Sequence, residues 1–217
     1  MNSKIKYLLV TLLIFIQFSC NEWLTLLPPS GLIREEFWQA KEDVEAVLMA
    51  SYESFASMDR ELLLHGELRA DLLEGDNNQP WRERNIMENN IYPDNRFVDW
   101  SDFYSIINSC NEVIKNAPLV QEIDDTFTDF EMKGYMSEAY FMRSLTYFYL
   151  IRIYGDVPLV LEPSESDDVD FFLPRSPEEE ILNQIVSDLK ANRDFAPSGG
   201  FPTIGENKGR ASKAAFD

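Results

Sequence analysis

Apolar side chains recur every three to four residues in several stretches of the chain, and this spacing predicts helices. The stretches cover residues 34–58, 100–117, 131–154 and 176–197, and residues 209–216 resemble the first turns of another helix. The sequence therefore predicts an all-α fold.

Residues 131–154 form the longest of these stretches, and apolar residues fall on nearly every side of the helix they predict. Such a helix must be buried by neighbours on several faces. It is not a membrane span, because charges interrupt it far short of the ~20 apolar residues required. Gly155 suits a left-handed residue after the last turn, and Pro158 prevents continuation. We expect a central, buried helix with a purely structural role.

Two of the charges on this helix, Glu138 and Arg143, are five positions apart and so about 140° apart around the axis. They cannot pair with each other as residues four apart would. A buried charge needs a partner, so each must find one on another element. We expect interhelical ion pairs that fix the packing rather than contacts with a ligand.

The helices at 100–117 and 131–154 are close in sequence, which favours an antiparallel hairpin. Ser101 or Asp99 would begin the first helix and Pro118 would end it. The run Ser176, Pro177, Glu178, Glu179 predicts a capping box for the next helix. Its buried stripe would be Ile181, Leu182, Ile185, Val186 and Leu189. Successive hairpins suggest a tetratricopeptide-like layout, although no fixed 34-residue period is present.

Residues 59–99 differ from the rest, because Asn, Asp and Pro at this density favour turns. We expect a long irregular loop insertion of the kind that carries function. A sugar is recognised by flat aromatic faces together with amides, carboxylates and guanidinium groups. This segment supplies them, and the candidate ligand-binding residues are Asp71, Asn77, Trp81, Arg82 and Asn95. Alternatively, Trp81 packs in a small local core.

The sequence gives no sign of catalysis. His65 is the single histidine, and we interpret it as a structural imidazole. Acidic residues are numerous, but no spacing singles out a glycosidase pair, and the common nucleotide, hydrolase and zinc-protease motifs are absent from the sequence. Two Cys and one His exclude a Cys/His zinc cluster. We therefore predict no catalytic residue, no metal and no cofactor.

The formal net charge of -19 shapes the choice of partners. A field of that sign repels nucleic acid and anionic lipid headgroups but tolerates neutral or cationic ligands. Nucleic acid is therefore excluded as a partner. Cys110 falls on the apolar face of a predicted helix, so we expect an inert, buried thiol.

The N-terminus has the features of an export signal. Lys4 and Lys6 precede a short apolar segment, residues 7–18, that ends in Phe-Ser-Cys at Cys20. A small residue before a cysteine at this distance resembles a bacterial lipobox, although Gln17 stands where Leu is usual. We expect a lipoprotein signal peptide at 1–19 and lipidation of Cys20. The alternative is an ordinary signal peptide in which Cys20 is incidental.

Several segments together resemble the SusD/RagB outer-membrane nutrient-binding lipoproteins of Bacteroidetes. They are the Cys20 lipobox with its Pro-containing tether, EEFWQAKEDVEAVLMASYESF, WSDFYSIINSCNEVIKNAP, EAYFMRSLTYFYLIRIYGDVPLV, PRSPEEEILNQIVSDL and GRASKAAF, in the order of the family. The third helical segment, with its Glu, Arg, aromatic run and Tyr-Gly-x-x-Pro, is the most specific. The resemblance covers nearly the whole chain outside residues 59–99.

The resemblance implies a lipidated tether at 20–33 and a SusD-like helical domain at 34–217 that is truncated at its C-terminus. It implies a non-enzymatic protein, lipid-anchored in the outer membrane and exposed at the cell surface. There it would bind a glycan and deliver it to a SusC-like TonB-dependent transporter. A peptide-binding member of the family, a helical scaffold that binds only protein and a surface glycoside hydrolase are the alternatives.

Overall fold

A computed structural model of the chain describes residues 37–70, 72–73, 76, 78, 80–164, 172–197 and 209–217. All of its described helices belong to one compact unit, Trp38–Asp217. The predicted signal peptide, Cys20 and the tether lie outside the described residues. Within the described part, no helix is long and apolar enough to cross a membrane.

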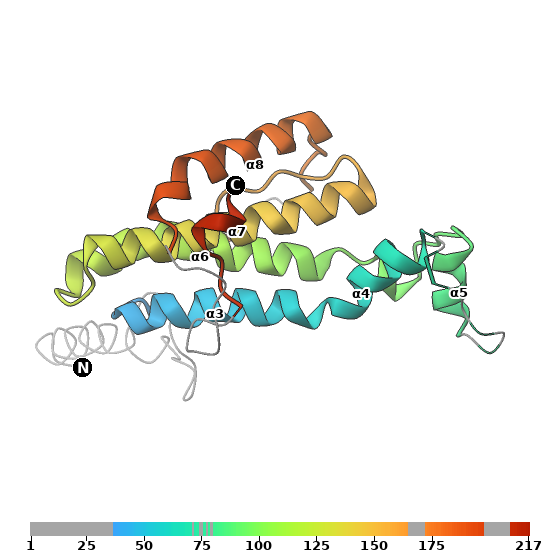
Figure 1. Cartoon of the computed structure of the whole chain (residues 1–217), viewed down its shortest axis with the longest axis horizontal. Coiled ribbons are helices and arrows are strands. Elements are labelled where there is room, and N and C mark those ends of the chain that lie inside the picture. The colour runs from blue at the N-terminus through green and yellow to red at the C-terminus, as the bar shows by residue number, and fades with distance from the viewer. Residues whose placement is uncertain are drawn as a thin grey trace, which may run out of the picture. The chain divides into compact units, whose positions relative to one another are not determined.

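Four long helices form the body of this unit (Figure 1): α3 (Lys41–Ser57), α6 (Ser101–Ile123), α7 (Asp129–Tyr154) and α8 (Glu178–Asn192). The shorter elements are α4 (Asp59–Leu63), the π-helix η1 (Leu64–Leu68), α5 (Trp81–Met87) and three 3-10 turns, η2 (Arg96–Val98), η3 (Arg193–Phe195) and η4 (Lys213–Ala215). The described residues contain no strand beyond a single bridge between Val157 and Ser176. The all-α prediction is confirmed.

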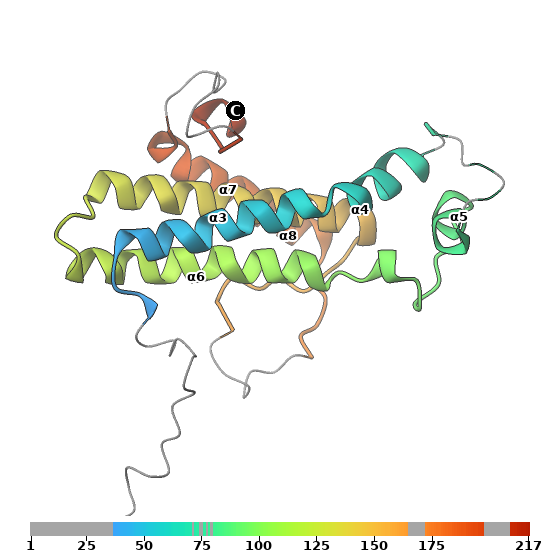
Figure 2. The ribbon, with the colours of Figure 1, turned by 90° about the horizontal axis from the view of Figure 1, so that it is seen from below.

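The antiparallel hairpin α6–α7 is the centre of the unit, as predicted. Helix α3 packs against both of its helices, and α8 packs on α7 on the side away from α3 (Figures 1 and 2). The core between these helices is continuous and fully buried; its members include Val44, Leu48, Phe103, Ile107, Val113, Met142, Tyr147, Leu150 and Ile181. Stacked helical hairpins of this kind are the tetratricopeptide-like layout expected from the sequence.

Helix α7 matches its predicted range closely. A capping box begins it, in which the Thr128 hydroxyl accepts the Glu131 N–H and the Glu131 carboxylate accepts the Thr128 N–H. Gly155 ends it at φ +70° and ψ -131°. The positive φ agrees with the prediction, but the ψ value lies outside the left-handed helical region, in a region that is essentially restricted to glycine.

Two helix boundaries differ from the prediction. Helix α3 begins at Lys41 rather than near residue 34, because the Asp43 carboxylate accepts the backbone N–H groups of Gln39 and Ala40 and so forms the start of the helix. Helix α6 continues through Pro118 to Ile123. A proline there removes one hydrogen bond, while the extra turn buries Val120 in the core. Asp99 accepts the Ser101 N–H at the start of α6.

The predicted capping box of α8 is absent, because Ser176 instead donates its N–H to the Val157 carbonyl. The Asp156 carboxylate caps the helix from a distance by accepting the Glu178 N–H at 3.0 Å. The expected buried stripe is also partly wrong. Ile181 and Ile185 are buried, whereas Leu182 and Val186 are exposed and the polar Asp188 is buried. The reason is an ion pair with α7, in which Asp188 takes part from the face of α8 that packs on α7.

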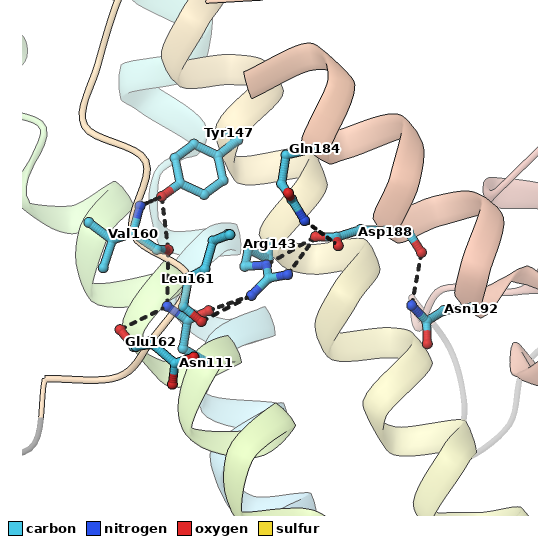
Figure 3. Close-up of polar contacts among 9 residues, drawn as sticks. All are labelled: Asn111, Arg143, Tyr147, Val160, Leu161, Glu162, Gln184, Asp188 and Asn192. Carbon is cyan, nitrogen blue, oxygen red and sulfur yellow. Dashed lines mark hydrogen bonds and ion pairs between the residues drawn. The ribbon is translucent and has the colours of Figure 1, made fainter. Parts of the chain in front are cut away.

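That pair joins Arg143 of α7 to Asp188 of α8 (Figure 3). The guanidinium Nη2 lies 2.6 Å from Asp188 Oδ2, and Nη1 donates to Asn111 Oδ1 of α6 at 2.8 Å. Gln184 donates a further bond to the other Asp188 oxygen. Both charged side chains are more than nine-tenths buried. One residue thus connects three helices.

Glu138 has its partner in the segment 209–217. Arg210 donates to both carboxylate oxygens of Glu138 at 2.9 and 2.7 Å and to Glu45 of α3 at 3.0 Å. Tyr52 of α3 also donates to Glu138. The interhelical ion pairs expected for Glu138 and Arg143 are therefore confirmed. The segment itself holds only the 3-10 turn η4 where the sequence suggested an α-helix.

An extended segment, residues 156–164, follows Gly155 and crosses α6 and α7. Side chains of both helices bond its backbone (Figure 3). Tyr147 donates to the Val160 carbonyl and accepts its N–H, and Asn111 donates to the carbonyls of Val160 and Glu162. Tyr104 donates to the Pro158 carbonyl. The polar residues on the hairpin thus fix the connection to α8.

Candidate ligand-binding site

The insertion at residues 59–99 is more helical than the sequence suggested, and it has a core of its own. Leu64 and Leu68 of η1, Ile86 of α5 and Phe97 of η2 form a buried cluster separate from the main core. Asn and Pro residues separate the short helices. Their turn propensity therefore predicted where helices are interrupted, but it did not predict the short helices between the interruptions. In Figures 1 and 2 this region lies at the end of the unit opposite the α6–α7 turn.

Helix α5 orients Trp81 and Arg82, two of the five predicted ligand residues. Glu83 and Ile86 form its buried face, and Glu83 pairs with Arg60 of α4. The preceding two positions consequently turn outward. Trp81 is 49% exposed, and the Arg82 guanidinium lies 4.6 Å from the centre of its ring. An exposed indole held by a cation is a surface feature, so Trp81 does not belong to the core of the insertion.

Asn95, the third predicted residue, is 1% exposed. Its Nδ2 donates to the Arg82 carbonyl at 2.9 Å, and its Oδ1 accepts the Phe97 N–H at 3.2 Å. Its amide therefore connects the loop at 93–99 to the first turn of α5. The structure gives Asn95 a structural task, which places this loop beside Arg82. Asp71 and Asn77, the other two predicted residues, lie outside the described residues.

A surface pocket of about 360 Å³ lies along this loop. Both polar and apolar residues line it: Pro93, Asp94, Asn95, Arg96, Val98, Asp99 and Trp100. The Arg175 guanidinium lies 4.9 Å from the centre of the Trp100 ring, and the edges of Tyr104 and Tyr154 approach the same ring. Asn95 both lines this pocket and bonds the Arg82 carbonyl, so it links the pocket loop to the backbone at the start of α5.

Sequence reasoning missed the pocket and the part that Trp100 plays in it. In the sequence, Trp100 marks only the point at which the helical period begins again after the insertion. Its position directly after a polar loop, with Asp99 before it, is the signal that could identify it as an aromatic residue beside that loop. Trp100 is half-buried because Arg175, Tyr104 and Tyr154 surround it.

His65 lies beneath this loop. Its Nε2 lies 2.6 Å from the Phe97 carbonyl oxygen, which agrees with a structural imidazole. Burial is the main reason that the pKa of His65 is lowered. The other ring nitrogen, Nδ1, is buried and has no hydrogen-bond partner among the described residues.

The chemistry available at this face is recognition by stacking and hydrogen bonding. Trp81 and Trp100 offer aromatic rings, Asp94 and Asp99 offer acceptors, and Arg96 offers donors. Among the described residues, no three His, Cys, Asp or Glu side chains converge as metal ligands would. Such a face suits a neutral ligand rich in hydroxyl groups, because sugars present apolar ring faces between their hydroxyls.

Comparison with known proteins identifies relatives of this chain. A SusD-like family model described as "Starch-binding associating with outer membrane" matches residues 22–215. A SusD-like protein of Formosa agariphila is 30% identical over 195 residues, which are 86% of this chain and 37% of that protein. The chain thus spans little more than a third of the length of this curated relative.

Solved structures share the fold. A SusD superfamily protein from Bacteroides vulgatus is 27% identical with a TM-score of 0.65, over 82% of this chain and 36% of that one. A laminarin-binding SusD-like protein is 21% identical with a TM-score of 0.64, over 82% of this chain and 38% of its own. The helical arrangement is therefore that of SusD-like proteins.

Proposed function

Because the chain belongs to the SusD-like (SusD/RagB) family, we propose that it binds an oligosaccharide nutrient at the cell surface and passes it to a transporter. The observation that carries the proposal is the exposed Trp81–Arg82 pair on α5, whose backbone Asn95 joins to the loop that lines the pocket at residues 93–100. The starch-binding description of the family model and the laminarin-binding relative support a glycan as the ligand. The chain covers 37% of the length of the curated relative from Formosa agariphila.

Trp81, Arg82 and Trp100 are the proposed contacts, and Asn95 positions the loop for them. Asp71 and Asn77 remain in the proposal from the sequence alone. A sugar ring would stack on Trp81, while its hydroxyls bond Arg82 and the carboxylates of the pocket. Stacking removes apolar surface from water, and charged partners make the strongest hydrogen bonds to hydroxyls.

Calorimetric titration with laminari- and malto-oligosaccharides tests this proposal. Trp81→Ala should weaken binding by about 2 kcal/mol, or roughly 30-fold, as for the loss of a central aromatic contact. Phe130→Ala is the matched control, because it removes an aromatic ring that is 80% exposed at the start of α7. Helicity measured by circular dichroism should be the same in both variants. Equal affinity of Trp81→Ala and the wild type would sink the proposal for Trp81.

The proposal includes binding without hydrolysis. Chromatography after prolonged incubation should recover the oligosaccharide unchanged. Release of shorter sugars would instead support the glycoside hydrolase alternative. A peptide-binding protein or a protein-binding scaffold would give no heat with any oligosaccharide.

Anchoring and partnership form the last part of the proposal. We expect Cys20 to be acylated after removal of residues 1–19, with the protein in the outer membrane and a SusC-like TonB-dependent transporter as its partner. Multiple acyl chains on one cysteine give stable attachment. Mass spectrometry of the N-terminal peptide should find them, and Cys20→Ser should move the protein out of the membrane fraction. If the Cys20→Ser variant were still recovered in the membrane fraction, lipid anchoring through Cys20 would be contradicted.

A further inference from the structure

His65 stands where the insertion meets the helical body. It belongs to the π-helix η1, in which the Arg69 N–H bonds the Leu64 carbonyl five residues earlier. A π-turn is rare and persists where something else holds it in place. Here the contacts of the imidazole ring supply part of that support.

The two ring nitrogens of His65 have different environments. The Phe97 carbonyl can only accept a hydrogen bond, so Nε2, at 2.6 Å from it, carries a proton. In the neutral ring Nδ1 is then bare, and it is buried without a partner in the described part of the chain. The ring centre lies 6.2 Å from that of Tyr154 at the end of α7, and the Tyr154 hydroxyl is likewise buried and unpaired there. The site is thus built for the neutral form.

The bond from His65 acts on the candidate site directly. Phe97 belongs to the insertion core, and the residues after it, Val98, Asp99 and Trp100, line the pocket. The centre of the Trp100 ring in turn lies 5.5 Å from the centre of the Tyr154 ring. His65 therefore contacts both sides of a junction: the segment that forms one wall of the pocket, and the helix on which that wall rests.

A second proton would put a positive charge into this junction. The charged and titratable groups that face the ring are Glu61 of α4, Arg69 after η1 and Tyr154 of α7, with Asp99 beside Tyr154. Burial lowers the pKa of His65 most, and Arg69 acts in the same direction. The bond to Phe97 and the charge of Glu61 oppose them without reversing the shift.

We propose that neutral His65 is the positioning residue of the candidate ligand site: it holds the 97–100 wall of the pocket against the end of α7, and its protonation loosens that wall and weakens ligand binding. The part that concerns ligand rests on the proposed function. The part that concerns the wall does not.

The direction of the pH effect follows from the lowered pKa. With the 97–100 wall loosened (the open state), His65 would bind the proton with a pKa near 6.5. With the wall held against α7 (the closed state), burial makes the ring bind the proton less readily. The contribution of His65 to the closed state is therefore complete above pH 6.5 and is lost as the pH falls below it. The closing equilibrium can change by at most tenfold per pH unit for one proton.

The first test needs no ligand. Because His65 is the single histidine, one imidazole resonance in a proton–carbon spectrum reports its titration, which should lie below pH 6.5. Hydrogen exchange, corrected for its intrinsic pH dependence, should show protection lost at residues 64–69 and 95–100 between pH 7.5 and 5.0. Amides in the centres of α6 and α7 should keep theirs.

His65→Gln is the decisive variant, because an amide can donate to the Phe97 carbonyl but cannot titrate. Its exchange at 64–69 and 95–100 should not depend on pH. The same pH-dependent loss in wild type and variant, or a titration of His65 at or above pH 6.5, would overturn the proposal. If the variant does not fold, the His65 titration and the hydrogen exchange of the wild type are sufficient to test the proposal.

The second test measures affinity for laminari- or malto-oligosaccharide between pH 7.5 and 5.0. The wild type should lose up to tenfold per pH unit below 6.5, while His65→Gln keeps a flat profile. Absence of binding at pH 7.5 would refute the proposed function and leave the exchange test to decide the role of His65. Binding with equal pH profiles in both proteins would refute the regulation while the proposed function stands.

Discussion

Arg143 shows how one buried side chain organises this protein. Its guanidinium bonds an aspartate on α8 and an asparagine on α6. The charge is thereby compensated, and both helices are fixed to α7. A charge on a helix with apolar residues on nearly every side could be recognised in the sequence as needing a partner. Asp188 could not be recognised as that partner, because it is one acidic residue among several on a helix with a polar face.

Asp188→Asn should therefore be strongly destabilising. The change leaves the Arg143 guanidinium buried without its counter-charge, and breaking a buried pair in this way costs about 3–5 kcal/mol. Denaturant unfolding at pH 7 measures the loss. Asp129→Asn is the matched control, because it removes the exposed pair with Lys133 and should cost less than about 1 kcal/mol. Equal losses in the two variants would contradict the role given to the Arg143 pair.

Cys110 was expected to be an inert, buried thiol, and the structure confirms its burial. Loss of solvation raises its pKa to about 12, so almost no reactive thiolate exists near neutral pH. Iodoacetamide at pH 8 should leave the Cys110 peptide unmodified in the native protein and modify it fully in denaturant. Mass spectrometry of the peptides distinguishes it from Cys20. Fast labelling of native Cys110 would show that α6 opens readily.

Helix ends depend on a few backbone positions, and Gly155 is the clearest. Its φ of +70° disfavours any residue with a Cβ, while the space around it is open. Gly155→Ala should therefore destabilise the protein by about 1–3 kcal/mol through backbone strain alone. Gly134→Ala, within α7, should instead stabilise it by about 0.5–1 kcal/mol, since its Cβ would meet only the Phe195 carbonyl at 3.9 Å. Thermal unfolding of the two variants should shift in opposite directions, and a shift in the same direction would contradict this account.

Two of the boundaries that sequence reasoning misjudged share one physical cause. Pro118 and Ser176 carry local signals for a helix end and a helix start, each worth about one hydrogen bond. Contacts with distant residues outweighed these signals: Val120 packs in the core, and Asp156 accepts the Glu178 N–H at the start of α8. The period of the apolar residues, by contrast, located the four long helices because it reflects burial directly.

The unit as a whole is completed by residues far apart in the sequence. Arg210 pairs with Glu138, which is 1% exposed, and with Glu45 of α3. Arg210→Met should destabilise the protein by about 3 kcal/mol or more, because it leaves the buried Glu138 carboxylate without its counter-charge. Adding Glu138→Gln should restore part of the loss, because the buried charge is then gone. Unfolding in urea measures both, and failure of the second change to recover stability would point to lost packing instead.

The candidate site also depends on the complete tertiary structure. Trp81 and Arg82 were recognised from the sequence because an aromatic residue beside a proline in a polar segment is difficult to place in a core. Asn95 was chosen for the same chemistry, yet among the described residues its amide bonds only backbone groups. Whether a polar side chain serves a ligand or the loop itself depends on its surroundings, which composition does not describe.

Periodicity, the cost of buried charge and motifs that are contiguous in the chain were enough to predict the helical class, the long helices, the need of Glu138 and Arg143 for partners, and the family. The folded chain was needed to identify the residues that pair with those charges, the exact ends of the helices, and the residues that surround Trp100 and His65. These depend on contacts between residues tens of positions apart, and packing rather than local preference selects them.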